Sequence, residues 1–226
     1  MKYDNILPAK FISRPNRFIA EIEVEGKCEI SHVKNTGRCK ELLTPGARVY
    51  VQRLDNLSRK TKYDLISVYK GQELINMDSQ APNKVFGEWV SEGGFINNLS
   101  LIKPECKYKN SRFDFYIEAD RRKIFVEIKG VTLEENGVVM FPDAPTERGV
   151  KHIRELCECI EDGYEAYIFF IIQMKNCSYF TPNRITHPEL ADALLEAKKK
   201  GVNINALNCI VKPDELKVER FVEIRL

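Results

Sequence analysis

Residues 123–130 (KIFVEIKG) carry an acid and a base two positions apart on an otherwise apolar stretch. Because side chains alternate between the faces of a strand, Glu127 and Lys129 point into the same space. A buried charge without a partner is costly, so a partner or a ligand must lie beside them. The tripeptide Glu-x-Lys recurs in this chain, but only this copy has strongly apolar flanks and a second acid, Asp114, on the preceding predicted strand.

A turn near residues 120–122 would join the predicted strand 112–119 to strand 123–130 and place Asp114 beside Glu127. Two converging carboxylates make a hard oxygen site of the kind that Mg²⁺ prefers, with Mn²⁺ as a substitute. A nearby lysine could bind phosphate, or orient a metal-bound water and help to deprotonate it. The residues therefore predict phosphodiester hydrolysis, with Asp114 and Glu127 as metal ligands. A purely structural cluster that holds the hairpin together is the alternative.

Three further residues are candidates for the same site. Glu88, on the first predicted helix of the C-terminal part, could add an acid near the metal or be a surface glutamate. Arg148 and His152 are four apart on the next predicted helix, so they share a face and could bind the scissile phosphate, or be ordinary polar residues on the flank of a helix. Thr146 is the expected N-cap of that helix. Asp143, just before it, is either a turn residue or holds a ligand.

From residue 80 onward, helical and strand patterns alternate. Helices are expected from Pro82 to the Gly93-Gly94 pair, over 146–162 and over 188–200. Strands are expected at 112–119, 123–130, 138–142, 164–173 and 202–211. The apolar run 166–172 is typical of a strand buried on both faces, as in a parallel sheet. The order α-β-β-β-α-β-α-β predicts a mixed sheet flanked by helices.

The first 75 residues show a different pattern, that of short strands separated by turns. Four short stretches with strand character, 17–24, 27–33, 47–54 and 64–69, are separated by turn signals such as Asn35-Thr36-Gly37. Short strands at this spacing predict a small barrel, and the length suits a five-stranded OB-like fold. We therefore expect two domains, 1–78 and 79–226, in an α/β (α+β) protein.

The overall formal charge of +2 hides an asymmetry, because residues 1–75 are net basic and the remainder is net acidic. The basic excess is concentrated between residues 34 and 62, a footprint that suits a polyanion as well as a merely solvated loop. The candidate nucleic-acid contacts are Lys34, Asn35, Arg38, Lys40, Arg48, Arg53, Arg59, Lys60 and Lys62. Phe18, Tyr50 and Tyr63 could add base stacking.

Composition sets the remaining limits. Of 226 residues, 43% are hydrophobic and 30% charged, which is typical of a globular chain and excludes a disordered one. No apolar run approaches the roughly 20 residues that span a bilayer, and the N-terminal residues lack a signal-peptide core, so we expect a cytoplasmic protein that does not bind membranes. The seven cysteines show no metal-binding or disulfide spacing, and most are expected to be buried small hydrophobes.

The strings FDFYIE, VEIKGVTL and FPDAPTERGVKHIREL, together with RFIAEIEV and HVKNTGR near the start, closely resemble the sugar fermentation stimulation protein A (SfsA) family. Asp114 with Glu127-Ile128-Lys129 on an α-β-β-β-α-β core also resembles the PD-(D/E)xK nuclease superfamily. Phe113 stands where the namesake motif of that superfamily has proline. The resemblance implies an N-terminal OB-fold domain, a nuclease-like C-terminal domain, DNA binding, metal ligands at Asp114 and Glu127, and the superfamily lysine at Lys129.

Two functions follow as hypotheses. The first is a nuclease dependent on Mg²⁺ or Mn²⁺, whose barrel holds nucleic acid, with DNA as the expected partner, while the C-terminal domain cuts it. The second is a non-catalytic DNA-binding regulator of sugar (maltose) metabolism genes on a nuclease-like fold. A carbohydrate- or protein-binding barrel with an inactive partner domain is a third, weaker alternative. Because a scaffold has no need of Asp114, Glu127 and Lys129 together, the trio favours catalysis. The oligomeric state, a homodimer included, stays open.

Overall fold

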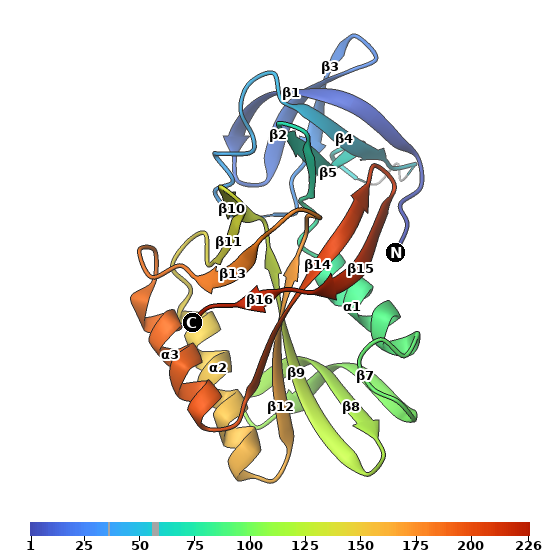
Figure 1. The fold of residues 1–226 in the computed structure, drawn as a ribbon. Helices are drawn as coiled ribbons and strands as arrows, with labels where there is room; N and C mark the ends of the chain where they lie inside the picture. Colours follow the sequence, from blue (N-terminus) through green and yellow to red (C-terminus); the bar gives the residue numbers. More distant parts are fainter. Residues whose placement is uncertain (36, 56–58) are drawn as a thin grey trace.

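The computed structural model describes residues 1–35, 37–55 and 59–226. A β-barrel stands above a mixed sheet that helices cover on both faces, and a small sheet lies between the two parts (Figure 1). In the described part of the chain, no helix has the length and apolar character that crossing a bilayer requires.

The N-terminal part forms the expected OB-like barrel. Its strands are β1 (Ile6–Asn16), β2 (Ile19–Val24), β3 (Lys27–His32), β4 (Arg48–Arg53), β5 (Tyr63–Lys70) and β6 (Glu73–Asn76). Strand β3 pairs in parallel with β5, which closes the ring in the order β1-β2-β3-β5-β4. The long strand β1 is not indicated by its sequence, because Pro8, Lys10, Arg14 and Pro15 obscure its alternation.

The main sheet of the C-terminal part has the order β15-β14-β12-β9-β8-β7. Its strands are β7 (Leu99–Tyr108), β8 (Ser111–Ala119), β9 (Arg122–Val131), β12 (Glu165–Ile172), β14 (Asn203–Lys212) and β15 (Glu215–Phe221). Strand β12 runs parallel to both β9 and β14 and is almost wholly buried, as its unbroken apolar run predicts. Strands β8 and β9 form the expected hairpin, with Asp120 and Arg121 at positive φ in the turn.

One predicted strand lies in a different sheet. Residues 138–142 form β11 (Val138–Phe141), which belongs to a small sheet of order β10-β11-β13-β16 and not to the main one. The strand that extends the β8–β9 hairpin in the main sheet is β7, which its sequence does not indicate. Strand β7 is a mostly exposed edge that contains Pro104, so it lacks the apolar alternation that marks a half-buried strand. The other strands of the small sheet are β10 (Leu133–Glu135), β13 (Tyr179–Pro182) and β16 (Glu223–Ile224).

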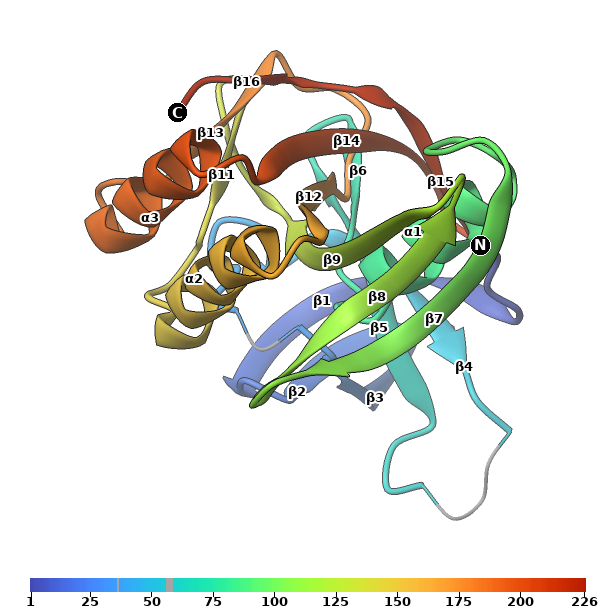
Figure 2. The same ribbon diagram turned by 90° about the horizontal axis from the view of Figure 1, so that it is seen from below.

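Three helices cover the main sheet. Helix α1 (Ala81–Ser91) lies on one side, and α2 (Glu147–Glu161) and α3 (Pro188–Lys199) lie on the other (Figure 2). The pleat of β9 divides its side chains accordingly: Val126 and Ile128 belong to the α1 core, whereas Phe125 packs in the core on the α2 side. Glu127, which alternates with Val126 and Ile128, therefore faces α2 as expected.

Polar contacts join the barrel to the C-terminal part. The Gln173 side-chain amide donates to Asn76 Oδ1 (2.9 Å) and to the Asp78 carbonyl (3.0 Å). Lys70, on β5, lies 2.6 Å from Glu134 Oε2 on β10. Because Asn76, Asp78 and Gln173 are buried, these bonds hold the start of α1 in a defined place relative to both parts.

Candidate active site

Asp114 and Glu127 meet where the ladder between β8 and β9 ends. The last pair of that ladder is Phe115 with Val126, and beyond it the Ile128 N–H donates to Asp114 Oδ2 (2.7 Å) instead of to a strand carbonyl. The Asp114 carboxylate thus lies beside the backbone of β9, next to Glu127, as the predicted hairpin requires. The two predicted metal ligands are brought together.

The Glu127 carboxylate is buried, and its two oxygens have different surroundings. Lys129 Nζ lies 2.6 Å from Oε1, and His152 Nδ1 lies 2.5 Å from the same oxygen. The other oxygen, Oε2, is buried without a hydrogen-bond partner among the described residues. An ionised oxygen is rarely left so in a folded protein, because its lost hydration is not replaced. A positively charged group at Oε2 would therefore stabilise this carboxylate.

Helix α2 supplies the two residues that were predicted from its spacing. His152 is buried beside Glu127, and Arg148 is exposed one turn earlier, with its Nε 3.4 Å from His152 Nε2. Arg148 donates to Nε2, so His152 presents N–H at Nδ1 to Glu127. Thr146 is the N-cap, and its hydroxyl accepts from Gly149 N (3.1 Å). The helix begins where the sequence predicts.

The two carboxyl groups differ in their electrostatics. Burial, followed by the charge of Glu127, raises the pKa of Asp114, although bonds from Ile128 and Asn83 oppose the shift. Burial also acts to raise the pKa of Glu127, but the hydrogen bond from His152 and the charge of Lys129 outweigh it and hold that pKa below its ordinary value. Two acids in contact, one of them kept ionised, form a site that a cation would stabilise.

Asn83 is a site residue that was not predicted from the sequence. Its amide donates to Asp114 Oδ1 (2.7 Å) from the first turn of α1. Beside it, Pro82 packs so closely on Gly130 that a Cβ at Gly130 would lie 2.8 Å from the proline ring. An asparagine just after a helix-starting proline is a signal that could have been noted, but only the fold shows which strand it faces.

Glu88 does not join the cluster. Its carboxylate lies 2.6 Å from the N-terminal ammonium of Met1, and its side chain is 53% exposed. Asn83 and Glu88 are five positions apart on α1, so their side chains leave the helix in different directions. Asp143 also lies apart from the cluster: its carboxylate packs against Gly37 of the barrel, where an added Cβ would come within 2.2 Å of Oδ2. The expectation that Glu88 adds an acid near the metal is therefore wrong, and Glu88 is a surface glutamate.

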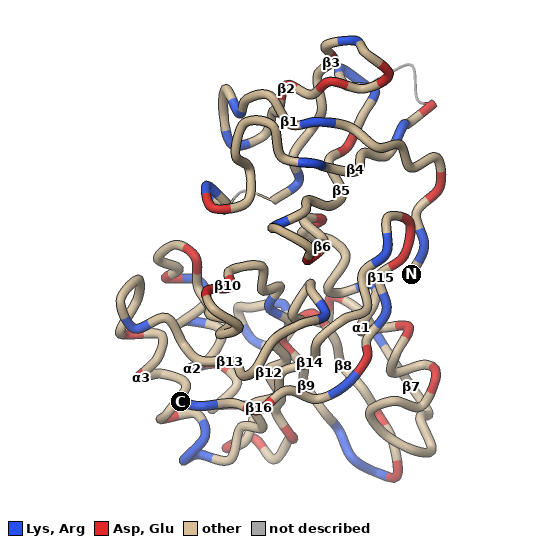
Figure 3. Tube along the Cα trace, turned by 45° about the horizontal axis from the view of Figure 1, so that its top comes forward, with Lys and Arg blue, Asp and Glu red and all other residues tan. Residues whose placement is uncertain are grey.

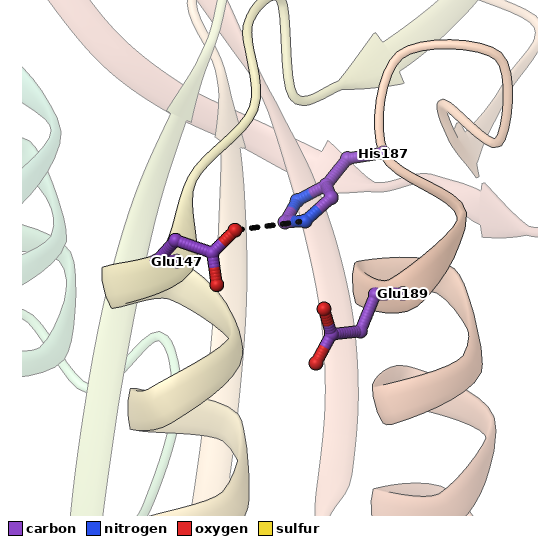
Figure 4. A group of neighbouring side chains, drawn as sticks. All are labelled: Glu147, His187 and Glu189. Carbon is purple, nitrogen blue, oxygen red and sulfur yellow. Dashed lines mark ion pairs between the residues drawn. The ribbon is translucent and has the colours of Figure 1, made fainter.

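A second group of ionisable side chains lies between the N-terminal ends of α2 and α3 (Figure 4). His187 Nε2 is 3.9 Å from Glu147 Oε1, and Glu189 stands on the neighbouring helix. His187 Nδ1 accepts from Thr146 N (3.3 Å), so in the neutral ring Nε2 carries the hydrogen and points it at Glu147. That tautomer leaves no lone pair for a metal, and the group links the two helix ends.

Lys34 and Arg59 form ion pairs with buried carboxylates. Lys34 Nζ lies 3.0 Å from Asp78 Oδ2 and 3.3 Å from Asp64 Oδ2, and its side chain is only 16% exposed. Arg59 lies 2.5 Å from Asp64 Oδ1. Both carboxylates are buried and need these cations. Lys34 is therefore an internal ion-pair partner, which corrects its assignment as a contact for a phosphate backbone. Arg59 is exposed and pairs with Asp64 from the surface.

The other predicted basic contacts are dispersed. In Figure 3 the blue segments of the barrel lie on several of its sides and are interrupted by red ones. Arg48 lies over the Tyr69 ring, 4.1 Å from its centre, and Arg53 is 3.9 Å from Asp55. Lys60 and Lys62 are exposed on the β4–β5 connection, next to residues 56–58, which lie outside the described residues.

Arg38 and Lys40 are the predicted contacts that share a groove. They line it together with Arg14 and Arg17, two cations of the β1–β2 hairpin that were not predicted from the sequence. Asn35 stands at the base of this loop and accepts from Gly37 N through Oδ1 (2.8 Å). Arg14 and Arg17 were not predicted because they lie outside the most basic segment of the chain, residues 34–62. The fold places part of that segment, residues 37–40, next to the β1–β2 hairpin.

The fold and the cluster define a two-part protein in which an OB-like barrel precedes an α/β unit that carries a carboxylate–lysine–histidine site. Two family models match these parts: "SfsA N-terminal OB domain" over residues 12–77, and "Sugar fermentation stimulation protein RE domain" over residues 80–215. The chain belongs to the sugar fermentation stimulation protein (SfsA) family.

Relatives of the whole chain agree with this assignment. It is 60% identical over 226 residues to the sugar fermentation stimulation protein homolog of Ruminiclostridium cellulolyticum, with 100% of both chains covered. The homolog of Desulfitobacterium hafniense strain Y51 is 62% identical, with 100% of this chain and 99% of the relative covered. The solved structure of Pyrococcus furiosus SfsA in complex with Ca²⁺ superposes with a TM-score of 0.92 at 30% identity, covering 100% of this chain and 98% of the other.

Proposed function

We propose that this protein hydrolyses phosphodiester bonds of nucleic acid, with DNA as the expected substrate, by means of a divalent cation held by Asp114 and Glu127. The observation that carries the proposal is Glu127 Oε2, a buried oxygen without a partner among the described residues, beside a second carboxylate. In this proposal the barrel (1–78) holds the substrate and the C-terminal domain (79–226) cuts it.

The donor set fits Mg²⁺ or Mn²⁺. Both ions take oxygen ligands and are commonly held by one or two carboxylates, with water and substrate phosphate filling the remaining positions. Asp114 is oriented by Asn83 and by the Ile128 N–H, each 2.7 Å away, so its oxygens are fixed before any ligand arrives. The bound ion would supply charge for the scissile phosphate and a more acidic water.

The other side chains have separate tasks. Lys129 holds its ammonium beside Glu127 with 16% of its side chain exposed, where it can stabilise the negative charge that develops on the phosphate. His152 holds the Glu127 carboxylate in one orientation from the opposite side. Arg148, exposed at the N-terminal end of α2, is positioned to bind a phosphate oxygen, where the backbone N–H groups of the first turn also favour an anion.

The Ca²⁺ complex of the Pyrococcus furiosus relative supports a divalent-cation site in this family. Calcium and magnesium share the preference for oxygen ligands, and calcium binds without the strict octahedral geometry of magnesium. If the relative holds its ion at the residues that correspond to Asp114 and Glu127, the same site would serve Mg²⁺ here.

The test is cleavage of labelled single- and double-stranded DNA and RNA with Mg²⁺, Mn²⁺ or EDTA. We expect cleavage with Mg²⁺ or Mn²⁺, none with EDTA, and none by Glu127→Gln, which keeps the shape of the side chain but loses its charge. Glu88→Gln is the matched control and should cut like the wild type. Binding without cleavage under every condition would contradict the proposal and favour a non-catalytic DNA-binding regulator.

A further inference from the structure

A groove of about 400 Å³ opens on the barrel between the β1–β2 hairpin and the loop that follows β3. Four cations line it, Arg14, Arg17, Arg38 and Lys40, and none of its described lining residues is acidic. Like charges gather in this way at a cost in mutual repulsion, which an anionic ligand removes. The groove therefore suits a polyanion.

One arginine builds this groove. Arg14 Nη1 donates to the carbonyls of Gly37 (2.9 Å) and Arg38 (2.8 Å), and Nη2 donates to those of Arg17 (2.7 Å) and Asn35 (2.7 Å). A single side chain thus ties the hairpin to the loop and fixes the backbone on both sides. Because both terminal nitrogens of Arg14 bind backbone carbonyls, a ligand would be bound by the other three cations of the groove, Arg17, Arg38 and Lys40.

These three cations are free to bind. In the described part of the chain, Arg17, Arg38 and Lys40 form no ion pair, and all three are exposed. Arg17 lies 4.8 Å from the ring centre of Phe18, which is 44% exposed. Phe18 directly follows Arg17, which lines the groove. An exposed aromatic ring next to a row of cations can bind single-stranded nucleic acid, since bases stack on the ring and phosphates pair with the cations.

The backbone holds Phe18 in place. Phe18 N donates to Asn16 Oδ1 (2.9 Å), and its carbonyl accepts from Val33 N (2.7 Å). The ring is therefore presented by a fixed turn, although it contributes little to the core. A base that stacks on it would lose its own freedom without having to order the loop.

We propose that this groove holds a single strand of nucleic acid, with its phosphates on Arg17, Arg38 and Lys40 and one base stacked on Phe18. The bases of a duplex are already stacked on one another, so a duplex offers Phe18 no free face along its length. The inference rests on the proposed function, because it names the form of the substrate that the barrel holds.

The groove also lies next to the C-terminal domain. Gly37, whose carbonyl Arg14 holds, packs against the Asp143 carboxylate. Asp143 precedes Thr146, the N-cap of the helix that carries Arg148, by three residues. A strand bound in the groove is thus held beside the connection that leads into the candidate active site.

The experiment measures binding separately from cleavage. Fluorescence anisotropy in EDTA gives the Kd of the full chain for a labelled oligothymidine and for a duplex of equal length. We expect tighter binding of the oligothymidine, a loss of about tenfold for Phe18→Ala on the single strand, and a change within twofold on the duplex. Phe221→Ala, which removes an exposed aromatic ring of β15, is the matched control and should change neither value.

A second variant tests the cations. Arg38→Ala with Lys40→Ala should weaken binding and reduce the log–log salt slope for the single strand by about 0.7 for each phosphate that is no longer neutralised. Equal weakening for single strand and duplex in Phe18→Ala, or wild-type preference for the duplex, would overturn the inference. If either of these results occurs but the protein still cleaves nucleic acid with Mg²⁺ or Mn²⁺, the proposed function stands and only the single-strand inference fails. If the protein prefers the single strand but cleaves nothing, only the proposed function fails.

Discussion

The two parts of the molecule use their charged residues in opposite ways. In the C-terminal part, Lys129 of β9 and His152 of α2 converge on the buried Glu127 carboxylate beside Asp114 of β8, and Glu127 Oε2 has no partner among the described residues. In the barrel, the predicted basic residues outside the groove of Arg38 and Lys40 are dispersed, and Lys34 and Arg59 neutralise buried acids. Convergence on an unsatisfied group indicates chemistry, whereas paired or scattered charge indicates stability and solubility.

The site residues and the basic residues also differ in how far their directions could be predicted. Asp114, Glu127 and Lys129 lie on strands, where the pleat fixes which side chains share a face. The basic residues lie mostly on loops, where spacing along the chain says little about direction.

The largest effect is expected at Lys129. Lys129→Ala should reduce cleavage by about 10²–10³-fold, because one charge that stabilises the transition state is removed, while nucleic-acid affinity stays within a few-fold. Single-turnover rates and anisotropy on the same substrate measure the two quantities. Lys40→Ala, in the barrel groove, should show the reverse pattern, with weaker binding and an unchanged rate at saturating protein. Full activity of Lys129→Ala would contradict the assignment.

The next effect concerns Lys34. Lys34→Met should lower the free energy of unfolding by about 3 kcal/mol, because it leaves the buried Asp64 and Asp78 carboxylates short of a partner. Chemical denaturation of wild type and variant measures the decrease, and Arg38→Met, on the exposed loop, should change stability by less than about 0.5 kcal/mol. A Lys34→Met protein of normal stability with weakened DNA binding would restore Lys34 to the nucleic-acid contacts.

A smaller effect is expected at Asn83. Asn83→Ala should weaken Mn²⁺ binding by about 10–100-fold, since the Asp114 carboxylate loses the amide that orients it. Asn98→Ala removes a similar bond, to Asp120 (3.0 Å) in the β8–β9 turn, and should leave Mn²⁺ affinity unchanged. Titration calorimetry measures the Mn²⁺ affinity of the wild type and of both variants. An Asn83→Ala protein with the same Mn²⁺ affinity as Asn98→Ala would show that α1 plays no part in the site.

The smallest effect tests the contact between the two parts. Burial acts to raise the pKa of Glu134, but hydrogen bonds from Lys70 and Gly137 outweigh it and lower that pKa below its ordinary 4.5. A lowered pKa adds stability above the unfolded-state value, and this stability is lost as the pH falls through the folded-state value. Glu134→Gln should therefore cost about 0.5–1 kcal/mol at pH 7 and progressively less in acid. A pH-independent difference would exclude the ion pair as the cause.

Much of the molecule could be predicted from the sequence. The β8–β9 hairpin, the buried strand β12 and the helix α2 with its N-cap Thr146 have strong periodicity, and the structure confirms them. Strands β1 and β7 could not be predicted, because prolines and charges break their alternation and neighbours in other parts of the chain stabilise them.

The site residues on strands could be predicted from the sequence. Of the site residues on helices, those on α2 could be predicted and those on α1 could not. Arg148 and His152 follow from helical spacing, and the fold brings His152 into contact with Glu127. The placement of Asn83 and Glu88 depends on the angle at which α1 crosses the sheet, which tertiary packing determines. No local pattern in the sequence reports that angle.

The proposed function depends on a divalent cation that Asp114 and Glu127 hold together. Titration calorimetry of Mg²⁺ and Mn²⁺ into the wild type, Glu127→Gln and Glu88→Gln measures this binding without any need for a substrate. We predict one site in the wild type and in Glu88→Gln, and none in Glu127→Gln, with circular dichroism confirming that all three are folded. Absence of binding to the wild type at millimolar metal, or undiminished binding to Glu127→Gln, would contradict the proposal.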